Sequence, residues 1–239
     1  MVGQITLYTA KICPYAHRAE IALAETGLPF RRVEIDLRNK PEWYPNVNPR
    51  GQVPAITYGG TEHPPEAPSA DAVKIAESLV LVDFFNDLHP DHPLLPTDPV
   101  LRARARFFVE AVSSRLVPGW AAAYRQGEGF EKLYAGLEFL QTLLPAGNKY
   151  VVGDQFTIAD IAIAPFFARL EVALRDDVGS FAVGEGPKAW NVLQTEPRFA
   201  RYREYWTNLK ARDSVKQTFD EENLRKDYAS RFGDQRRKA

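Results

Sequence analysis

The first part of the chain alternates between the hydrophobic periods of strands and helices. Residues 6–8 (TLY) suit a strand, and residues 30–37 (FRRVEIDL) alternate apolar and polar side chains as a second strand does. Between them, residues 16–24 have the apolar spacing of a helix, which we expect to end at Gly27. Strand, helix and strand predict a βαβ unit with a parallel strand pair.

Two more strands and a helix are predicted before residue 88. Residues 53–58 (VPAITY) read as a strand whose proline, Pro54, stands near its start, where a cis or a trans bond is open from sequence. Residues 59–72 are rich in Gly, Pro and acid and predict an exposed, mobile loop. Residues 73–76 (VKIA) predict a short strand, and residues 79–88 an apolar helix.

The pattern changes after a proline-rich linker at residues 89–97. From there on the apolar spacing is that of helices, and Pro118 with Gly119 is expected to bend or break the first of them. We therefore predict an α/β plus all-α protein: a thioredoxin-like domain over residues 1–88 and an all-helical domain over residues 98–239. The helical segments are 100–126, 129–144, 161–174, 188–195, 198–220 and 221–232.

The best defined of these helix starts is at Thr157. A threonine followed by Asp160 three residues later predicts a capping box, with Asp in place of the usual Glu. Residues 161–174 are apolar nearly all round, which indicates a buried helix. Asp160 is therefore expected to be structural.

Composition excludes several function classes. The 239 residues hold 30 basic and 31 acidic side chains, a balance without the basic footprint of a nucleic-acid-binding protein. No apolar run approaches the roughly 20 residues of a membrane span, and no signal-like segment precedes the first strand. With one cysteine and no possible internal disulfide, we expect a cytoplasmic protein that binds neither membrane nor metal.

Candidate chemistry centres on Cys13, the only cysteine. Pro14 is well placed in the first turn of a helix, so Cys13 stands at a helix start, where backbone N–H groups favour an anion. The thiolate is the reactive form of cysteine. The alternative interpretation is a buried, inert thiol. Ala16 stands where a C-x-x-C pair has its second thiol, so any redox cycle needs an external one.

Five motifs resemble those of cytosolic glutathione transferases, most of all the omega class and its fungal members. They occur in the family's order and span most of the chain. They are CPYAHR at 13–18, NKPEW at 39–43, NPRGQVP at 48–54, ES at 77–78 and TIAD at 157–160.

The resemblance implies where glutathione binds. Residues that match Glu77 and Ser78 hold its γ-glutamyl end, although an isolated Glu-Ser pair also reads as simple helix capping. The match to Lys40 reaches the glycine carboxylate. The match to Val53 pairs its backbone with the cysteinyl part, and the match to Pro54 is cis. These roles suit the charges of the ligand.

The leading hypothesis is an enzyme, a cysteine-type thiol transferase. The resemblance implies that Cys13 forms a mixed disulfide with glutathione, the cosubstrate, and acts in deglutathionylation and dehydroascorbate reduction. It also implies a homodimer. The loop at 59–72 is longer than in human-like members, which leaves open the strand pairing before Glu77 and the shape of the cleft rim.

Two other hypotheses stay open. The first is a protein that binds aromatic small molecules such as plant polyphenols, with Tyr15, Trp120, Tyr124 and Arg169 lining the site; Trp120 and Tyr124 read equally well as helix packing. The second is a non-catalytic relative with the same fold, against which the retained site residues argue.

Overall fold

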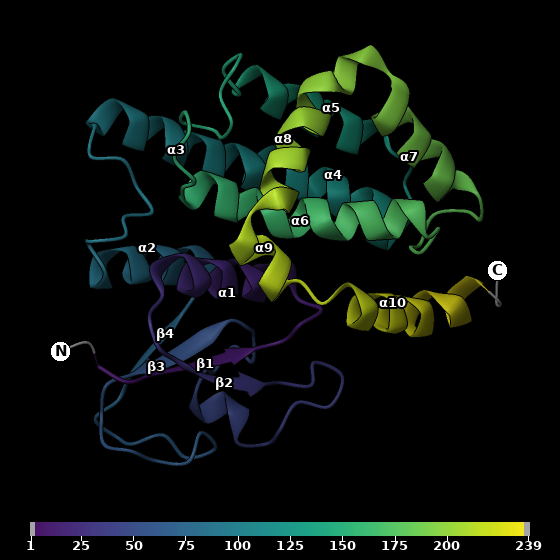
Figure 1. Ribbon diagram of the computed structural model, residues 1–239. Coiled ribbons are helices and arrows are strands. Elements are labelled where there is room, and N and C mark those ends of the chain that lie inside the picture. Colours follow the sequence, from purple (N-terminus) through teal and green to yellow (C-terminus); the bar gives the residue numbers. More distant parts are fainter. Residues whose placement is uncertain (1–2, 237–239) are drawn as a thin grey trace. The chain divides into compact units, whose positions relative to one another are not determined.

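The computed structural model describes residues 3–236 and divides the chain into two compact units. The first unit ends at Leu94 and the second begins at Leu95 (Figure 1). The α/β plus all-α prediction is confirmed, because every strand in the described chain lies in the first unit and the second is helical. The domain bounds 1–88 and 98–239 stay a prediction beside this division.

The first unit is built on a four-stranded sheet in the order β2-β1-β3-β4. The parallel pairing of β1 with β2 confirms the βαβ unit, while β3 runs antiparallel to both β1 and β4. The strands are β1 (Ile5–Thr9), β2 (Arg31–Glu34), β3 (Ala55–Tyr58) and β4 (Val73–Ala76). The second strand is shorter than predicted, because the Asp36 carboxylate accepts a hydrogen bond from the Arg38 N–H at 2.8 Å and turns the chain.

Two helices pack on one face of this sheet, α1 (Pro14–Thr26) and α2 (Ser78–Leu88) (Figure 1). Helix α1 ends as predicted at Gly27, whose φ of 68° needs glycine. The opposite face carries a cluster of buried residues, among them Tyr8, Tyr44 and Val53, and Cys13 packs at its margin. Core residues of the unit therefore pack against the residue at which α1 begins.

The second unit surrounds one buried helix, α6 (Ile158–Arg175), as its apolar sequence predicted. The other α-helices are α3 (Pro99–Ala111), α4 (Val117–Ala121), α5 (Glu131–Thr142), α7 (Glu185–Thr195), α8 (Ala200–Ala211), α9 (Asp213–Thr218) and α10 (Glu221–Arg236).

Of the two alternatives predicted at Pro118, a bend or a break, the break is wrong, since helical turns continue from Pro99 to Gln126. Two segments of wider π-helical turns, Val112–Leu116 and Ala122–Gln126, flank α4. At the first of them the Val117 N–H bonds to the carbonyl five residues back. This wider turn accommodates a proline, which lacks an N–H and clashes with the carbonyl four residues earlier.

The capping box at the start of α6 is confirmed. The Thr157 side chain accepts a hydrogen bond from the helix backbone, and the Asp160 carboxylate accepts one from the Thr157 N–H at 2.8 Å. The same carboxylate accepts hydrogen bonds from the Tyr205 hydroxyl at 2.7 Å and the Val151 N–H at 3.3 Å. Asp160 therefore ties the helix start to two other segments of the unit.

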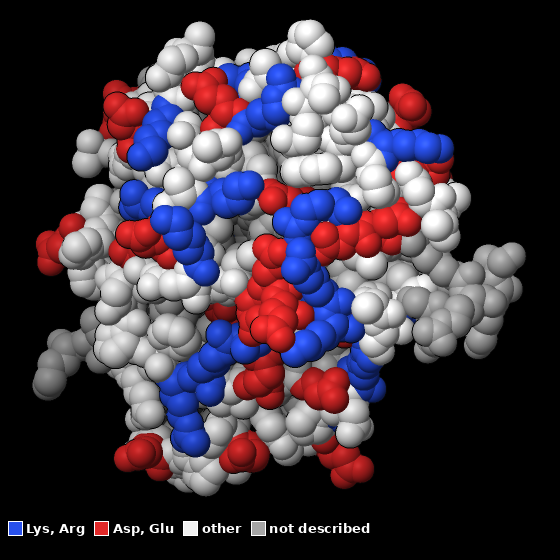
Figure 2. Space-filling view, turned by 45° about the vertical axis from the view of Figure 1, so that its right-hand side comes forward, with Lys and Arg blue, Asp and Glu red and all other residues white. Residues whose placement is uncertain are grey.

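The surface shows no large field of either sign on the face in Figure 2, where basic and acidic side chains lie interleaved. Among residues 3–236, no helix is both long and apolar enough to cross a membrane. The same described residues contain no cluster of His, Cys, Asp or Glu suited to holding a metal ion.

Candidate active site

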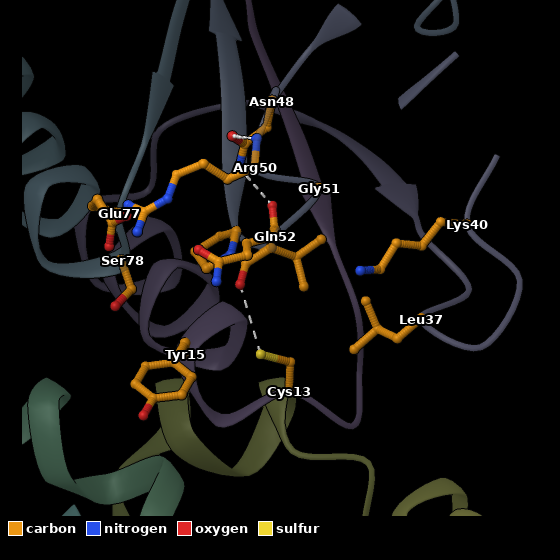
Figure 3. A pocket seen from close by; sticks show the side chains of 12 residues that line it. Cys13, Tyr15, Leu37, Lys40, Asn48, Arg50, Gly51, Gln52, Glu77 and Ser78 are labelled. Atoms are coloured by element: carbon orange, nitrogen blue, oxygen red, sulfur yellow. Dashed lines mark hydrogen bonds and ion pairs between the residues drawn. The ribbon is translucent and has the colours of Figure 1, made fainter. Parts of the chain in front are cut away.

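A cavity of about 570 Å³ opens in the first unit beside Cys13 (Figure 3). It brings together every residue of that unit that the sequence marked as a candidate: Cys13, Tyr15, Lys40, Val53, Pro54, Glu77 and Ser78. Five other lining residues were not predicted, namely Leu37, Asn48, Arg50, Gly51 and Gln52. Asn48, Arg50, Gly51 and Gln52 belong to the NPRGQVP motif, so the motif itself was the available signal.

Cys13 is the N-cap of α1 and is only partly buried. Its backbone is extended, with φ −84° and ψ 120°, and its sulfur accepts a hydrogen bond from the Ala16 N–H at 3.5 Å. The thiol in turn lies 3.7 Å from the Val53 carbonyl oxygen. A partly exposed sulfur at the positive end of a helix dipole is in a setting that favours the thiolate, unlike a thiol that is fully buried in a core.

The backbone before β3 forms the wall opposite the thiol. The Val53–Pro54 peptide bond is cis, which settles the question that the sequence left open. Val53 precedes Ala55, the first paired residue of β3, so its peptide group lies before the ladder with β1 and β4. This backbone is within reach of an extended ligand that approaches Cys13.

Glu77 and Ser78 form one end of the cavity. Glu77 has a φ of 77°, outside the range that most residues adopt, and its side chain makes no capping hydrogen bond. Its carboxylate instead pairs with the Arg50 guanidinium at 2.5 Å (Figure 3). The simple capping interpretation therefore does not describe Glu77, whose carboxylate faces a cation.

Arg18, which closes the CPYAHR motif, lies behind the cavity lining in contact with Ser78, and the sequence analysis did not single it out. It is 2% exposed, and its guanidinium donates to the Ser78 hydroxyl oxygen at 3.3 Å. Burial lowers the pKa of Arg18 to about 10, so it stays protonated at neutral pH. Because Arg18 only donates, the Ser78 hydroxyl accepts from it and keeps its own proton for an oxygen in the cavity.

Lys40 reaches into the cavity from the side opposite Glu77 and Ser78, with Cys13 between the two ends (Figure 3). The cavity thus offers a cation at one end, a carboxylate and a hydroxyl at the other, and a sulfur in the middle. That arrangement complements an elongated molecule with a carboxylate at one end, an amino-acid group at the other and a sulfur between them.

The sequence left open whether the 59–72 loop shapes the rim of the cleft, and no residue of this loop lines the cavity beside Cys13. It is held to the sheet by a hydrogen bond from the Tyr8 hydroxyl to the Pro65 carbonyl, at 2.7 Å. The strand pairing before Glu77, which the sequence left open, is regular, since β4 pairs with β3 in an antiparallel ladder. Pro65 and Ser69 are buried, while most of the segment is exposed.

The remaining candidates, Trp120, Tyr124 and Arg169, lie in the helical unit. Trp120 and Tyr124 stack at 4.8 Å between ring centroids, and the Tyr124 ring also lies 5.0 Å from both Tyr228 and Phe232. Burial raises the pKa of the Tyr124 hydroxyl. Arg169 is fully buried and donates to the carbonyl of Pro165 at 3.1 Å.

Known proteins match both units. The profile of the glutathione S-transferase N-terminal domain matches residues 12–88, and that of the C-terminal domain matches residues 102–205. The crystal structure of glutathione transferase Omega 1C from Trametes versicolor shares 52% identity and a TM-score of 0.93, covering 97% of this chain and 98% of that one. The crystal structure of glutathione transferase Omega 2C from Trametes versicolor shares 47% identity and a TM-score of 0.91, covering 97% of this chain and 99% of that one.

Curated relatives agree with these structures. Glutathione S-transferase omega-2 from Homo sapiens is 30% identical over 177 residues, which are 71% of this chain and 68% of that protein. Pyrimidodiazepine synthase from Drosophila melanogaster is also 30% identical, over 71% of this chain and 66% of that protein. The matched stretch thus spans about two thirds of these relatives.

The two domain profiles cover most of the chain, and the cavity beside Cys13 has the polarity that glutathione, the cosubstrate of these enzymes, requires. The chain therefore belongs to the glutathione S-transferase family, and within it to the omega class.

Proposed function

We propose that this protein is a glutathione-dependent thiol transferase that removes glutathione from mixed disulfides. The observation that carries the proposal is the position of the Cys13 sulfur. It stands at the N-terminus of α1, partly exposed, in a cavity with charged groups at both ends. A cysteine here supplies a nucleophile, whereas conjugation to chlorinated aromatics needs a hydroxyl that stabilises the free glutathione thiolate.

The reaction proceeds in two exchange steps. The Cys13 thiolate attacks the glutathionyl sulfur of a mixed disulfide; the old S–S bond breaks, and the substrate leaves as a thiolate that takes a proton from water. The thiolate of a second glutathione then attacks the Cys13-bound glutathione, which leaves as oxidised glutathione and frees Cys13. With a single cysteine in the chain, this external thiol is the only one that can complete the cycle. Dehydroascorbate reduction consumes two glutathiones through the same sulfur.

The charged groups of the cavity orient glutathione for this attack. Lys40 is assigned to the glycine carboxylate, the Ser78 hydroxyl and its helix N-terminus to the γ-glutamyl carboxylate, and Glu77 to the γ-glutamyl ammonium. Glu77 must exchange its partner Arg50 for that ammonium, a change between two exposed ion pairs that costs little. The Val53 backbone is assigned to the cysteinyl part, beside the sulfur.

The proposal is tested by the mass of the intact protein after incubation with oxidised glutathione. We expect a gain of one glutathionyl group, its reversal by reduced glutathione, and no gain in a Cys13→Ser variant. Lys40→Met serves as a matched control, because it keeps the thiol and should slow the reaction without preventing it. A wild-type protein that forms no adduct would overturn the proposal.

A second candidate function is the binding of aromatic small molecules. Glutathione transferase Omega 2S from Trametes versicolor, 38% identical to this chain, was crystallised in complex with 2,4-dihydroxybenzophenone. In this chain, Trp120 and Tyr124 stack on each other, and Tyr15 is 36% exposed beside Cys13. Displacement of a fluorescent aromatic probe by flavonoids, weakened in a Tyr15→Ala or Trp120→Ala variant, would support this function. Equal displacement in both variants would argue against these residues.

A cytoplasmic homodimer accompanies the proposal, as the family resemblance implies. Val100 and Phe107 of α3 are 59% and 56% exposed, apolar surface of the kind that an interface covers. Sedimentation of the wild type as a dimer, and of a Phe107→Glu variant as a smaller species, is the expected result. A wild type that sediments as a monomer would contradict it.

A further inference from the structure

Two cationic side chains, Lys40 and Arg50, are among the lining residues that the structure describes for the cavity beside Cys13. The proposed function assigns Lys40 to the glycine carboxylate of bound glutathione and gives no role to Arg50. The Arg50 side chain extends along the cavity wall toward Glu77, whose carboxylate it pairs with (Figure 3). The cavity therefore contains one positive charge that the bound glutathione does not explain.

The backbone of Arg50 is held in place, whereas its side chain is not. The Arg50 N–H donates to the side-chain oxygen of Asn48 at 3.1 Å, and the Gly51 N–H donates to the Asn48 carbonyl at 2.8 Å. The ion pair with Glu77, in contrast, joins side chains that are 68% and 58% exposed. Because an ion pair between groups this exposed is weak, the guanidinium can change partners while its backbone stays in position.

Binding of the first glutathione removes the partner of Arg50. On the proposed assignment the γ-glutamyl ammonium takes the place of the guanidinium at Glu77. The γ-glutamyl carboxylate lies at Ser78, with the buried Arg18 cation behind the hydroxyl. The glycine carboxylate lies at Lys40. Each charged group of the ligand then faces its own group of the protein, and the Arg50 guanidinium is left exposed to the next reactant.

That reactant is the thiolate of a second glutathione. It has two carboxylates and a thiolate against one ammonium, so it is an anion. Its carboxylates lie several bonds from the sulfur, and one of them can bind at Arg50 while the sulfur reaches the disulfide at Cys13. A cation at an exposed rim raises the rate at which such an anion arrives and orients it.

We propose that Arg50, released from Glu77 by the first glutathione, binds the second one and thereby accelerates the resolving step. In this step the incoming thiolate forms a bond to the glutathionyl sulfur, the bond from that sulfur to Cys13 breaks, and Cys13 leaves as a thiolate without net proton transfer. The inference rests on the proposed function, because it concerns the second of the two exchange steps.

The test isolates that step. Protein with one glutathionyl group on Cys13 is mixed with reduced glutathione and quenched at intervals, and the intact mass gives the fraction that remains. We expect Arg50→Gln to react about fivefold more slowly than the wild type, and Arg50→Lys, which keeps the charge, to stay within about twofold of it. Arg31→Gln should equal the wild type; it is the matched control, since Arg31 is exposed on β2 and does not line the cavity.

Two further measurements identify charge as the cause. With 2-mercaptoethanol, a thiol without carboxylates, Arg50→Gln and the wild type should react at the same rate. Each variant is compared with the wild type for the same thiol, so that differences in thiol acidity cancel. Higher ionic strength should slow the wild type with glutathione and narrow its difference from Arg50→Gln, because salt screens exposed charges.

The first exchange step should not depend on Arg50, which is paired with Glu77 until glutathione binds. Adduct formation from an uncharged glutathionylated peptide should proceed at the same rate in Arg50→Gln and the wild type. Isothermal titration in the Cys13→Ser background should show an unchanged or higher affinity for the first glutathione, because Glu77 has lost a competing partner.

Three results would overturn the proposal. The first is resolution by glutathione at the wild-type rate in Arg50→Gln. The second is equal slowing with 2-mercaptoethanol, which would indicate a change at the disulfide itself. The third is an affinity for the first glutathione that falls more than about threefold in Arg50→Gln, which would place Arg50 on that molecule. A wild-type protein that forms no adduct would overturn thiol transfer and this role together, so the two failures are distinguishable.

Discussion

Helices α1 and α6 both begin after a residue in extended conformation, Cys13 in the first unit and Thr157 in the second. At α6 the cap is complete: Thr157 and Asp160 are fully buried, and their oxygens bond to the backbone N–H groups of the helix start. At α1 the cap is a sulfur that accepts one long hydrogen bond, from the Ala16 N–H at 3.5 Å.

The difference shows that the same backbone arrangement can stabilise a helix start, as at α6, or leave it available to an anion, as at α1. Short oxygen acceptors satisfy the N–H groups of α6, so that its start contributes stability. Sulfur is a larger and weaker acceptor, and Pro14 removes one N–H from the set at α1. The positive end of the α1 dipole is therefore left for an anion, which is the thiolate itself. Substitutions at each helix start test this comparison.

Replacing the sulfur should have the largest effect. Cys13→Ser keeps an N-cap residue, and a better one, so the thermal stability should be retained or slightly raised. Thiol transfer should fall by at least ~10³-fold, because the nucleophile is lost. Initial rates with a glutathionylated peptide and a thermal melt measure both quantities. A thiol-transfer rate above a tenth of the wild-type rate would contradict the role assigned to the sulfur.

Removing the acid of the α6 cap should act on stability. Asp160→Ala leaves the Tyr205 hydroxyl and the Thr157 N–H buried without their acceptor, a loss of about 3 to 4 kcal/mol in the free energy of unfolding. Urea unfolding measures this loss. The folded fraction should retain the wild-type rate of adduct formation at Cys13, and a slower rate would show that Asp160 also serves the site.

The same carboxylate predicts a dependence on pH. Burial raises the pKa of Asp160 to about 6, despite the hydrogen bonds that oppose it. The folded state therefore binds this proton more tightly than the unfolded chain does. The contribution to stability is full below about pH 4 and is lost as pH rises to about 6, by about 3 kcal/mol at most.

An Asp160→Asn variant isolates that contribution, because it lacks the titrating group. The difference in unfolding free energy between the wild type and the variant should shift in favour of the variant from pH 4 to pH 6 and stay constant above. A difference that does not change across this range would show that the pKa of Asp160 is not raised.

The smallest effect is expected at the third helix start, that of α2. Ser78→Ala removes the hydroxyl that Arg18 orients toward the cavity, so affinity for glutathione should fall about tenfold. Isothermal titration of the Cys13→Ser background measures it without adduct formation. A Ser78→Thr variant, which keeps the hydroxyl, should restore most of the affinity; an unchanged affinity in Ser78→Ala would remove Ser78 from the site.

Local signals in the sequence predicted the elements around both caps. The Cys-Pro helix start, the Thr157–Asp160 capping box, Gly27 and the strand at β4 all depend on residues close together in the chain, where spacing and propensity decide the structure. The motif resemblance placed the candidate residues of the Cys13 cavity. The roles of these residues in binding glutathione remain proposals.

What the sequence did not reveal depends on distant partners. Arg18 meets Ser78 across 60 positions, and Arg50 meets Glu77 across 27. The break expected at Pro118 failed because the preceding π-helical turn absorbs the proline, a rearrangement that no single-residue propensity encodes. The sequence could not decide whether Trp120 and Tyr124 pack between helices or bind a ligand, because the rings beside Tyr124 come from the distant α10.

The loop at residues 59–72 has a practical value for anyone who wants to modify this protein. The Tyr8–Pro65 hydrogen bond anchors it to the sheet, and none of its residues lines the Cys13 cavity. Its tip at residues 61–63 is exposed. A peptide tag inserted there would allow immobilisation or labelling without modifying the unique thiol. Variation in the length of this loop should likewise leave the reaction at Cys13 unchanged.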